Sequence, residues 1–142
     1  MQVQEIMSRD VHLADPNMTI RDAARQMRAD NIGSLPVGEN DRLIGMVTDR
    51  DIAMRAVAEG RAPGTTTVRE VMSEGIRYCF DDDDAKDAAK LMAKHQIRRL
   101  PVINHDKRLV GVLALADLGR SDGGSAQGAL KGISEPTDEP RR

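Results

Sequence analysis

Two short stretches of the sequence carry residue types that could bind a charged or hydroxylated ligand. Residues 45–51 read GMVTDRD, and residues 111–117 read GVLALAD. In the first stretch, a hydroxyl at Thr48 and a carboxylate at Asp51 follow a glycine at intervals of three residues. The second stretch keeps the glycine and the carboxylate but has Ala114 in place of the hydroxyl. The pattern predicts two related sites of unequal binding capacity.

The first stretch has the groups that an anion or a ribose would need. Thr48 falls where a strand pattern gives way to a helix, so its hydroxyl and the free N–H groups of the helix start suit a phosphate. Asp51 can accept two hydrogen bonds from a vicinal diol, each worth roughly 1.5–3 kcal/mol at a charged acceptor. The alternative is structural: Thr48 or Asp49 caps the helix, and Asp51 complements its dipole. These residues alone leave both interpretations open.

Both stretches belong to an internal repeat that spans most of the chain. A shift of 66 positions aligns LIGMVTDRD (43–51) with LVGVLALAD (109–117). Because the second copy has one added residue near Lys107, the earlier segments align at a shift of 65. Identical residues recur in one order, which indicates a duplicated unit. The earlier aligned segments are IMS (6–8) with VMS (71–73), RDAARQM (21–27) with KDAAKLM (86–92), and IGSLPV (32–37) with IRRLPV (97–102).

Each copy has the same expected order of elements, β-α-β-β-α, after a short helical turn. The turn of the second copy has Thr67 and Glu70 at the spacing of a capping box. The first long helix of each copy starts at Thr19 or Asp84, both good N-cap types. The apolar faces of these helices follow i, i+3, i+4, i+7 spacing. They comprise Ile20, Ala23, Ala24 and Met27 in one copy, and Ala85, Ala88, Ala89 and Met92 in the other.

Strands are expected on both sides of each long helix. Extended segments precede the helices at 11–14 and 76–80, and two strands joined by a polar turn follow each of them. Gly45 lies within one of these strands, where a missing side chain lets a backbone or a ligand approach closely. A second helix is expected at about 50–58 in the first copy and at 115–118 in the second.

We therefore predict an α/β (α+β) fold of two βαββα repeats. The repeats occupy residues 1–58 and 67–120, and residues 59–66 form a linker because they carry glycine and proline. Residues 121–142 are rich in Gly, Ser, Pro and charge, and we expect a flexible tail there in which AQGALKG could form a short helix.

The composition is that of a globular protein with an aliphatic core. The chain has 142 residues, a formal net charge of -2 and 39% hydrophobic residues, and its aromatic residues are Tyr78 and Phe80. So few aromatics cannot build a stacking platform for nucleic acid, and no basic run supplies the charge that a nucleic-acid binder needs. The start lacks the apolar segment of a secretion signal, and no stretch approaches the length of a membrane span. We therefore expect a cytoplasmic protein.

Other reactive groups have plainer interpretations. DDDD (81–84) puts carboxylates in a loop before a helix, where they point in different directions and the last one caps the helix. His12, His95 and His105 lack metal-ligand spacing, so no metal site is expected. Cys79 lies on an expected buried strand without a suitably spaced histidine, so a nucleophile is not expected. As the single cysteine, it excludes an internal disulfide and fits a reducing compartment.

Taken together, these features resemble the cystathionine-β-synthase (CBS) domain pair. The resemblance rests on the MS residues that open each copy, the helix beginning at MTIRDAA, the strands IGSLPV and IRRLPV, and GMVTDRD. It covers roughly residues 3–120, and the chain looks like the small stand-alone bacterial CBS-pair proteins. The resemblance implies two repeats packed pseudo-symmetrically into one module, a homodimer of such modules, and clefts between the repeats that bind AMP, ATP, NAD or S-adenosylmethionine.

The resemblance also implies which residues line the primary cleft. Asp51 would bind the ribose there, while apolar residues and backbone amides hold the adenine. Arg98 or Arg99 would bind phosphate through planar guanidinium donors. The expected ligand-binding residues are Gly33, Met46, Thr48, Asp51, Arg77, Tyr78, Ile97, Arg98, Arg99 and Pro101.

The second cleft departs from the family pattern. Ala114 stands where a hydroxyl is expected, and Gly33 and Ser34 stand where the other half has arginines. Asp117 could still bind a ribose, but the grip on phosphate is expected to be weak. The residues expected in this weaker site are His12, Leu13, Ile32, Gly33, Ser34 and Asp117.

Two further groups of residues have a structural alternative. Arg98 and Arg99 could be an ordinary surface pair at a strand end, and strand alternation lets one of them at most face a ligand. Ile52, Met54 and Val57 exceed what one core face needs. They could pack between the subunits of a dimer or in an intramolecular core.

The expected function is regulatory: the module senses an adenine nucleotide by population shift and is not an enzyme. AMP or ATP is favoured because Arg98 and Arg99 suit phosphate, NAD and S-adenosylmethionine are further candidates, and no catalytic cofactor is expected. The signal would pass through a homodimer or to an unidentified effector protein, without nucleic acid or membrane as a partner. The alternatives are a ligand-free CBS module for protein interaction, and a nucleotide-processing enzyme, for which no base, nucleophile or metal set is discernible.

Overall fold

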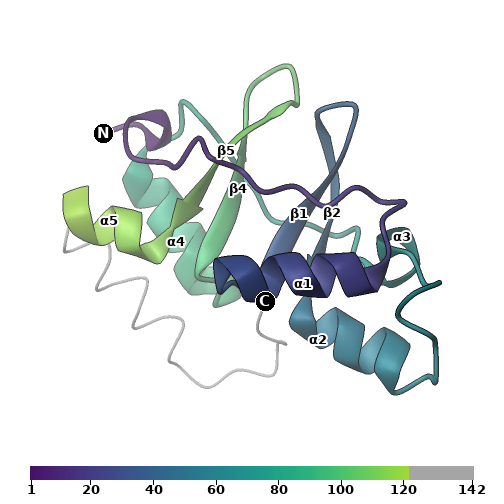
Figure 1. Ribbon diagram of the computed structural model, residues 1–142. Helices are drawn as coiled ribbons and strands as arrows, with labels where there is room; N and C mark the ends of the chain where they lie inside the picture. The colour runs from purple at the N-terminus through teal and green to yellow at the C-terminus, as the bar shows by residue number, and fades with distance from the viewer. Residues whose placement is uncertain (122–142) are drawn as a thin grey trace. The chain divides into compact units, whose positions relative to one another are not determined.

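The computed structural model describes residues 1–121, and its mixture of helices and strands confirms the predicted α+β class (Figure 1). The contacts divide the chain into two compact units. The middle unit comprises His12–Ile76, and the terminal unit joins Met1–Val11 to Arg77 and the residues that follow it. The predicted tail, with AQGALKG, lies outside the described residues beyond Ser121.

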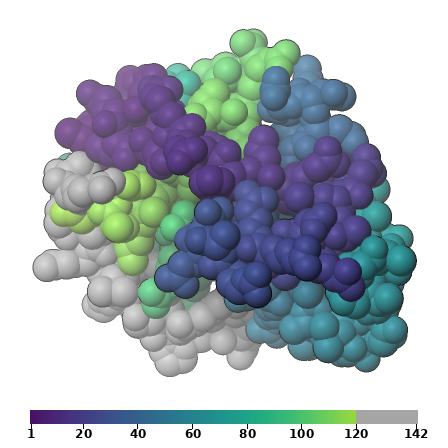
Figure 2. Space-filling view, viewed as in Figure 1, coloured from purple at the N-terminus to yellow at the C-terminus, as the bar shows by residue number. Residues whose placement is uncertain are grey.

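These units do not coincide with the two sequence repeats. Ser8, near the start of the first repeat, pairs with Val112 of the second, and each amide donates to the other carbonyl at 2.9 Å. Ser73, near the start of the second repeat, pairs in the same way with Met46 of the first, at 2.8 and 2.9 Å. Figures 1 and 2 show the N-terminal residues (purple) against the second repeat (green). The opening segment of each repeat therefore completes the other repeat.

The middle unit is built on an antiparallel hairpin. Its strands pair from Ser34 with Thr48 to Glu39 with Arg42, and the register shifts at Val37/Gly38. The helix predicted at 50–58 is present as a short α-helix that continues as a π-helical turn. The elements are α1 (Ile20–Asp30), β1 (Ser34–Glu39), β2 (Arg42–Thr48), α2 (Asp49–Ile52), the π-helical turn η2 (Ala53–Val57) and α3 (Val68–Val71).

The terminal unit repeats this hairpin and adds a strand to it. One strand, β3, runs parallel to β4, and β4 is antiparallel to β5 from Arg99 with Ala114 to Ile103 with Leu109. The helix predicted at 115–118 starts as expected and extends to Ser121. The elements are the 3-10 turn η1 (Val3–Glu5), β3 (Cys79–Phe80), α4 (Ala85–His95), β4 (Arg99–Ile103), β5 (Leu109–Ala114) and α5 (Leu115–Ser121).

The long helices begin where their sequences predict. The Thr19 hydroxyl accepts the N–H of Asp22 at 3.2 Å, and the Asp84 carboxylate accepts that of Lys86 at 2.9 Å. These side chains satisfy N–H groups that have no partner inside the helix. The two helices also end alike, because the residues after them, Asn31 and Gln96, both have φ 54°. The capping box predicted for Thr67 and Glu70 is present in α3.

The strand predicted at 11–14 is wrong in extent: it is reduced to one bridge between Ala14 and Val37. The strand predicted at 76–80 is also too long, because its counterpart β3 covers Cys79–Phe80. Its pairing continues beyond Phe80, because the N–H of Asp81 donates to the Ile103 carbonyl at 2.9 Å. The residue aligned with Asp81 is Pro16, which has no N–H to donate. The first copy therefore cannot extend the ladder at this point.

Each unit has its own aliphatic core, and the helix faces agree with the predictions except at one position. Ala24 is exposed, whereas its counterpart Ala89 is buried. Ala24 is exposed because this side of α1 lines an open hollow in the middle unit. The fully buried residues include Ile20, Ala23, Leu35, Val37, Val47, Val68 and Val71 in the middle unit, and Val3, Met92, Leu100, Val102, Leu113 and Leu118 in the terminal unit.

Candidate functional site

The GMVTDRD stretch forms a corner where β2 turns into α2. We define the first corner as Gly33, Ser34, Thr48, Asp49 and Asp51. Ser34 and Thr48 are register partners across the hairpin, and the N–H of Asp49 donates to the Gly33 carbonyl at 2.9 Å. A Cβ at Gly33 would lie 2.9 Å from the Asp49 carboxylate. The corner thus brings the predicted hydroxyl, carboxylate and glycine together.

Thr48 and Asp51 form a reciprocal cap on α2. The N–H of Asp51 donates to the Thr48 hydroxyl, and the N–H of Thr48 donates to Oδ2 of Asp51, both at 3.0 Å. The side chains are buried, with 7% and 5% exposure. The structural interpretation of the sequence is therefore realised here, with Thr48 rather than Asp49 as the cap.

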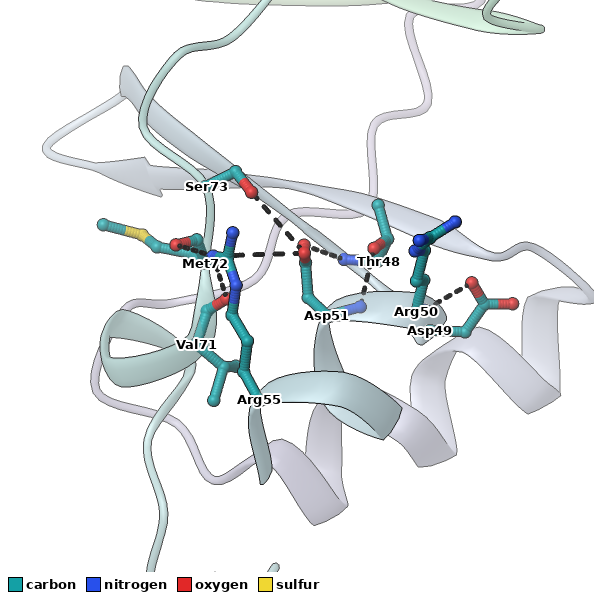
Figure 3. Close-up of polar contacts among 8 residues, drawn as sticks. All are labelled: Thr48, Asp49, Arg50, Asp51, Arg55, Val71, Met72 and Ser73. Carbon is teal, nitrogen blue, oxygen red and sulfur yellow. Dashed lines mark hydrogen bonds and ion pairs between the residues drawn. The ribbon is translucent and has the colours of Figure 1, made fainter. Parts of the chain in front are cut away.

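The other oxygen of the Asp51 carboxylate has different neighbours (Figure 3). The Ser73 hydroxyl lies 3.5 Å from Oδ1, and Nη1 of Arg55 lies 4.0 Å from it. The same Arg55 nitrogen donates to the carbonyls of Val71 and Met72 at 3.0 Å. Oδ1 therefore faces a hydroxyl and a cation while Oδ2 caps the helix.

The second copy builds the corresponding corner in the terminal unit. We define the second corner as Arg98, Arg99, Ala114, Leu115 and Asp117. The N–H of Leu115 donates to the Arg98 carbonyl at 2.9 Å, and that of Ala114 donates to the Asp117 carboxylate at 2.8 Å. Asp117 is buried like Asp51. Since Ala114 has no hydroxyl, the carboxylate half of the capping box is present and the hydroxyl half is missing.

The glycines of the two stretches serve the backbone. A Cβ at Gly45 would lie 2.8 Å from the Ser73 carbonyl oxygen, and a Cβ at Gly111 would lie 2.8 Å from that of Ser8. Each glycine thus admits the paired opening segment of the other repeat. The repeated MS dipeptide was the available signal for this pairing, but a local pattern does not say which hairpin it contacts.

The remaining residues predicted for the primary site lie in both units. Met46 is half-buried in the pairing with Ser73. The exposed residues of the set in the terminal unit are Arg77, Tyr78, Arg98 and Arg99. The Tyr78 ring packs edge to face on Phe80, with 5.8 Å between the ring centroids. Ile97 and Pro101 are buried there. Because β4 begins at Arg99, the alternation argument for the arginine pair applies from that residue onward and does not orient Arg98.

The residues predicted for the weaker site lie in the middle unit, apart from Asp117. Nδ1 of the exposed His12 is 3.5 Å from the Asp30 carboxylate. Leu13 packs over Gly38, where a Cβ would meet its methyl groups at 3.2 Å. Ile32 packs against the core of the middle unit, and Ser34 opens β1.

A hollow of about 410 Å³ adjoins the first corner. Gly33 and Asp49 line it, but Thr48 and Asp51 do not. The hollow therefore includes Gly33, predicted for both sites, and Ile32, predicted for the weaker one, but not the hydroxyl and carboxylate of the primary site. Its other lining residues are Ala24, Met27, Arg28, Asn31, Ile32 and Ile52.

The DDDD loop contains a grouping that sequence spacing did not indicate. Asp83 and Asp84 make structural hydrogen bonds, to the N–H groups of Phe80 and Lys86. Ligand atoms of Asp81, Asp82 and His105 lie within 4.8 Å of one another. The pair of Asp82 with the His105 ring, at 2.8 Å, accounts for this closeness, and we assign the group no role. The hydrogen bond and the charge of Asp82 raise the pKa of His105 above 6.5.

The single cysteine is in an unreactive state. Cys79 is buried on β3, and burial, aided by Asp83 and Asp81, raises the pKa of its thiol to about 12. A thiol with this pKa is protonated at neutral pH and is a poor nucleophile.

Among residues 1–121, no helix has the length and apolar character needed to cross a membrane.

Comparison with known proteins gives one family for both halves of the chain. Residues 3–57 and 68–121 each match the CBS domain family. The CBS domain-containing protein YhcV of Bacillus subtilis is 45% identical over 134 residues, which cover 93% of this chain and 94% of that protein.

Solved structures agree with this match. Hypoxic Response Protein I, crystallised with two coordinated zinc ions, has a TM-score of 0.77 and 38% identity, covering 85% of this chain and 98% of that one. The CBS domain pair of protein MJ0100, in complex with 5′-methylthioadenosine and S-adenosyl-L-methionine, has a TM-score of 0.73 and 30% identity, covering 87% and 97%.

Proposed function

Because the chain belongs to the CBS domain family, which it matches twice, we propose that it is a regulatory module that binds an adenosine-containing ligand and carries out no chemistry on it. The MJ0100 pair supports this ligand class, since it binds two adenosine derivatives. Binding would shift the population of conformations by the difference in affinity between them. The output would pass to a partner protein or through an assembly of this chain.

The observation that carries the proposal is that the two oxygens of the Asp51 carboxylate have different partners. Oδ2 accepts the N–H of Thr48, whereas Oδ1 faces the Ser73 hydroxyl. An oxygen that can accept a hydrogen bond from the Ser73 hydroxyl can also accept one from a ribose hydroxyl that takes the place of Ser73. Helix capping and ligand binding therefore use different oxygens, and the cap fixes the carboxylate in place for the ligand.

We place the ligand against the residues predicted for the primary site, with Asp51 at the ribose and Arg98 or Arg99 at a phosphate. Both arginines are exposed, and a guanidinium group matches the geometry of phosphate oxygens. This chemistry favours AMP or ATP, with NAD and S-adenosylmethionine as further candidates. The site around Asp117 is proposed to be weaker because Ala114 supplies no hydroxyl.

An assembly of two copies is part of this proposal. Met54 and Val57, on the helical segment after the first corner, are 57% and 68% exposed. Exposed aliphatic side chains on one segment support pairing with a second copy. A single free cysteine supports a reducing, cytoplasmic location.

The alternative is a ligand-free module for protein interaction. The reciprocal hydrogen bonds of Thr48 and Asp51 favour it, because they explain both residues without a ligand. A thermal shift on adding nucleotide would count against this alternative.

Calorimetric titration of AMP, ATP, NAD and S-adenosylmethionine tests the proposal. We expect at least one of them to bind the wild type and Asp51→Asn to weaken that binding roughly ten- to a hundredfold, through the lost ribose bonds. Asparagine keeps an acceptor for the Thr48 N–H, so the cap is retained. Asp117→Asn is the matched control, because it makes the same change in the second corner, and we expect it to leave the primary binding step unchanged.

Absence of binding by all four compounds would support the ligand-free alternative. Binding that Asp51→Asn leaves intact would show that the ligand occupies a different site. Circular dichroism of both variants would confirm that they fold.

A further inference from the structure

Arg55 makes contacts that neither sequence repeat predicts. It lies one helical turn after Asp51, on η2, with its side chain 48% exposed. Its Nη1 donates to the Val71 and Met72 carbonyls at 3.0 Å and lies 4.0 Å from Oδ1 of Asp51. One guanidinium nitrogen thus lies beside both the end of α3 and the Asp51 carboxylate, which is the group proposed to bind a ribose (Figure 3).

The two carbonyls need a donor because of where they lie. The last carbonyls of a helix have no partner within it, and basic side chains often supply one. The helix α3 ends at Val71, and Met72 already has extended backbone angles. Arg55 therefore fixes the point at which the chain leaves α3.

Ser73 follows directly, and three of its groups are held in place. Its N–H and carbonyl pair with Met46, and its hydroxyl faces Oδ1 of Asp51. A Cβ on Gly45 would collide with its carbonyl, so the segment has little room to shift toward β2. The chain then crosses from the middle unit to the terminal unit between Ile76 and Arg77.

We infer that Arg55 is a positioning residue that ties this crossing segment, residues 71–76, to the Asp51 carboxylate, so that a ligand hydroxyl at Oδ1 displaces the Ser73 hydroxyl and loosens the segment. This inference rests on the proposed function, because it needs a hydroxyl-bearing ligand at Asp51. It assigns the coupling to the first copy. The position aligned with Arg55 in the second copy is Ser121, which has no cation.

Hydrogen exchange of the full chain, without ligand, tests the positioning role. Arg55→Ala should raise the exchange of the Met72 and Ser73 amides roughly tenfold, because the hydrogen bonds at the end of α3 are lost. Arg61→Ala is the matched control. Arg61 pairs with Glu70 of α3 at 2.6 Å and carries the same charge, but this ion pair does not involve the carbonyls of Val71 and Met72. Equal exchange in the two variants would overturn the role of Arg55.

Exchange with saturating AMP tests the coupling itself. In the wild type, AMP should raise the exchange of amides 71–76, and in Arg55→Ala this ligand-dependent change should disappear. Arg55→Lys, which keeps the charge and several donors, should restore part of it. Ser73→Ala should bind AMP about two- to tenfold more tightly, since the ligand no longer competes with a hydroxyl.

These arms separate the inference from the proposed function. If AMP does not bind the wild type, the exchange experiment is run with whichever of ATP, NAD and S-adenosylmethionine binds. If none of the four binds, the coupling is overturned together with the proposed function, while exchange without ligand still decides the positioning role. If AMP binds in an Asp51-dependent way and amides 71–76 do not respond, the coupling alone is wrong. If Arg55→Ala does not fold, Arg55→Lys and Ser73→Ala carry the same test.

Discussion

The first and second corners share a backbone arrangement and differ in the side chains placed on it. In each, the first helical N–H donates at 2.9 Å to the carbonyl that precedes the hairpin, from Asp49 to Gly33 and from Leu115 to Arg98. In each, a buried aspartate caps the helix. The first corner adds the Thr48 hydroxyl, and the second adds two exposed arginines. The duplicated contacts form the fold, whereas the Thr48 hydroxyl and the two arginines each occur in one copy only.

The strongest test of the shared part is to fill the two glycines. Gly45→Val and Gly111→Val should each lower the free energy of unfolding by about 3 kcal/mol, because each new side chain meets a paired backbone segment. Urea unfolding measures the loss. Gly75→Ala is the control, since a Cβ there has nothing within 4 Å. A large loss at one glycine and none at the other would break the equivalence of the corners.

Removing the Thr48 hydroxyl should convert the first corner into the second. Thr48→Ala deletes the acceptor for the Asp51 N–H, and loss of such a cap costs about 1 kcal/mol. Thermal or urea unfolding would detect it, with the exposed Thr65→Ala as the control. An unchanged stability would mean that the hydroxyl is not the working cap of α2.

The reverse exchange should stabilise the second corner. Ala114→Thr places a hydroxyl at the position aligned with Thr48, three residues before Asp117, and we expect a gain of roughly 0.5–1 kcal/mol in unfolding free energy. Ala116 is exposed and lies two residues after Ala114, so Ala116→Thr controls for the effect of a threonine in this region. Destabilisation by Ala114→Thr would show that the two corners differ in backbone as well as in side chains.

The smallest expected effect concerns a contact of the second copy. Asp82 and His105 form an ion pair at 2.8 Å, whereas the aligned residues of the first copy are Asn17 and Asn40. Asp82 raises the pKa of His105, so any stabilisation is complete below about pH 6.5 and is lost as pH rises through the folded pKa. An NMR titration should place the His105 pKa above 6.5, and Asp82→Asn should lower it. A wild-type value at or below 6.5 would contradict the contact.

Local patterns were sufficient for the elements of the fold. Capping residues such as Thr19 and Asp84 satisfy their own helix within three residues, so their role is visible in the sequence. The alternation of apolar residues located both hairpins, and the repeat gave the family. The spacing of Thr48 and Asp51 located the first corner and left its purpose open between a cap and a ligand.

The features that the sequence did not predict depend on contacts between distant segments. The exchange of the opening segments joins Ser8 to Val112 and Ser73 to Met46, and no local period encodes such a pairing. Arg55 looks like an ordinary surface arginine until α3 places two carbonyls beside it. Pro16 is a partial exception: because proline has no N–H to donate, its position in the sequence could have predicted a shorter first strand.

The exchange of opening segments also decides what a protease could do to this chain. A cut within the linker at residues 59–66 would leave residues 1–11 in the N-terminal fragment, although they pack with the terminal unit. Residues 67–76 would stay in the C-terminal fragment, although they pack with the middle unit. Each unit would therefore contain segments from both fragments, and a nicked chain would behave as a complemented whole rather than as two separable domains.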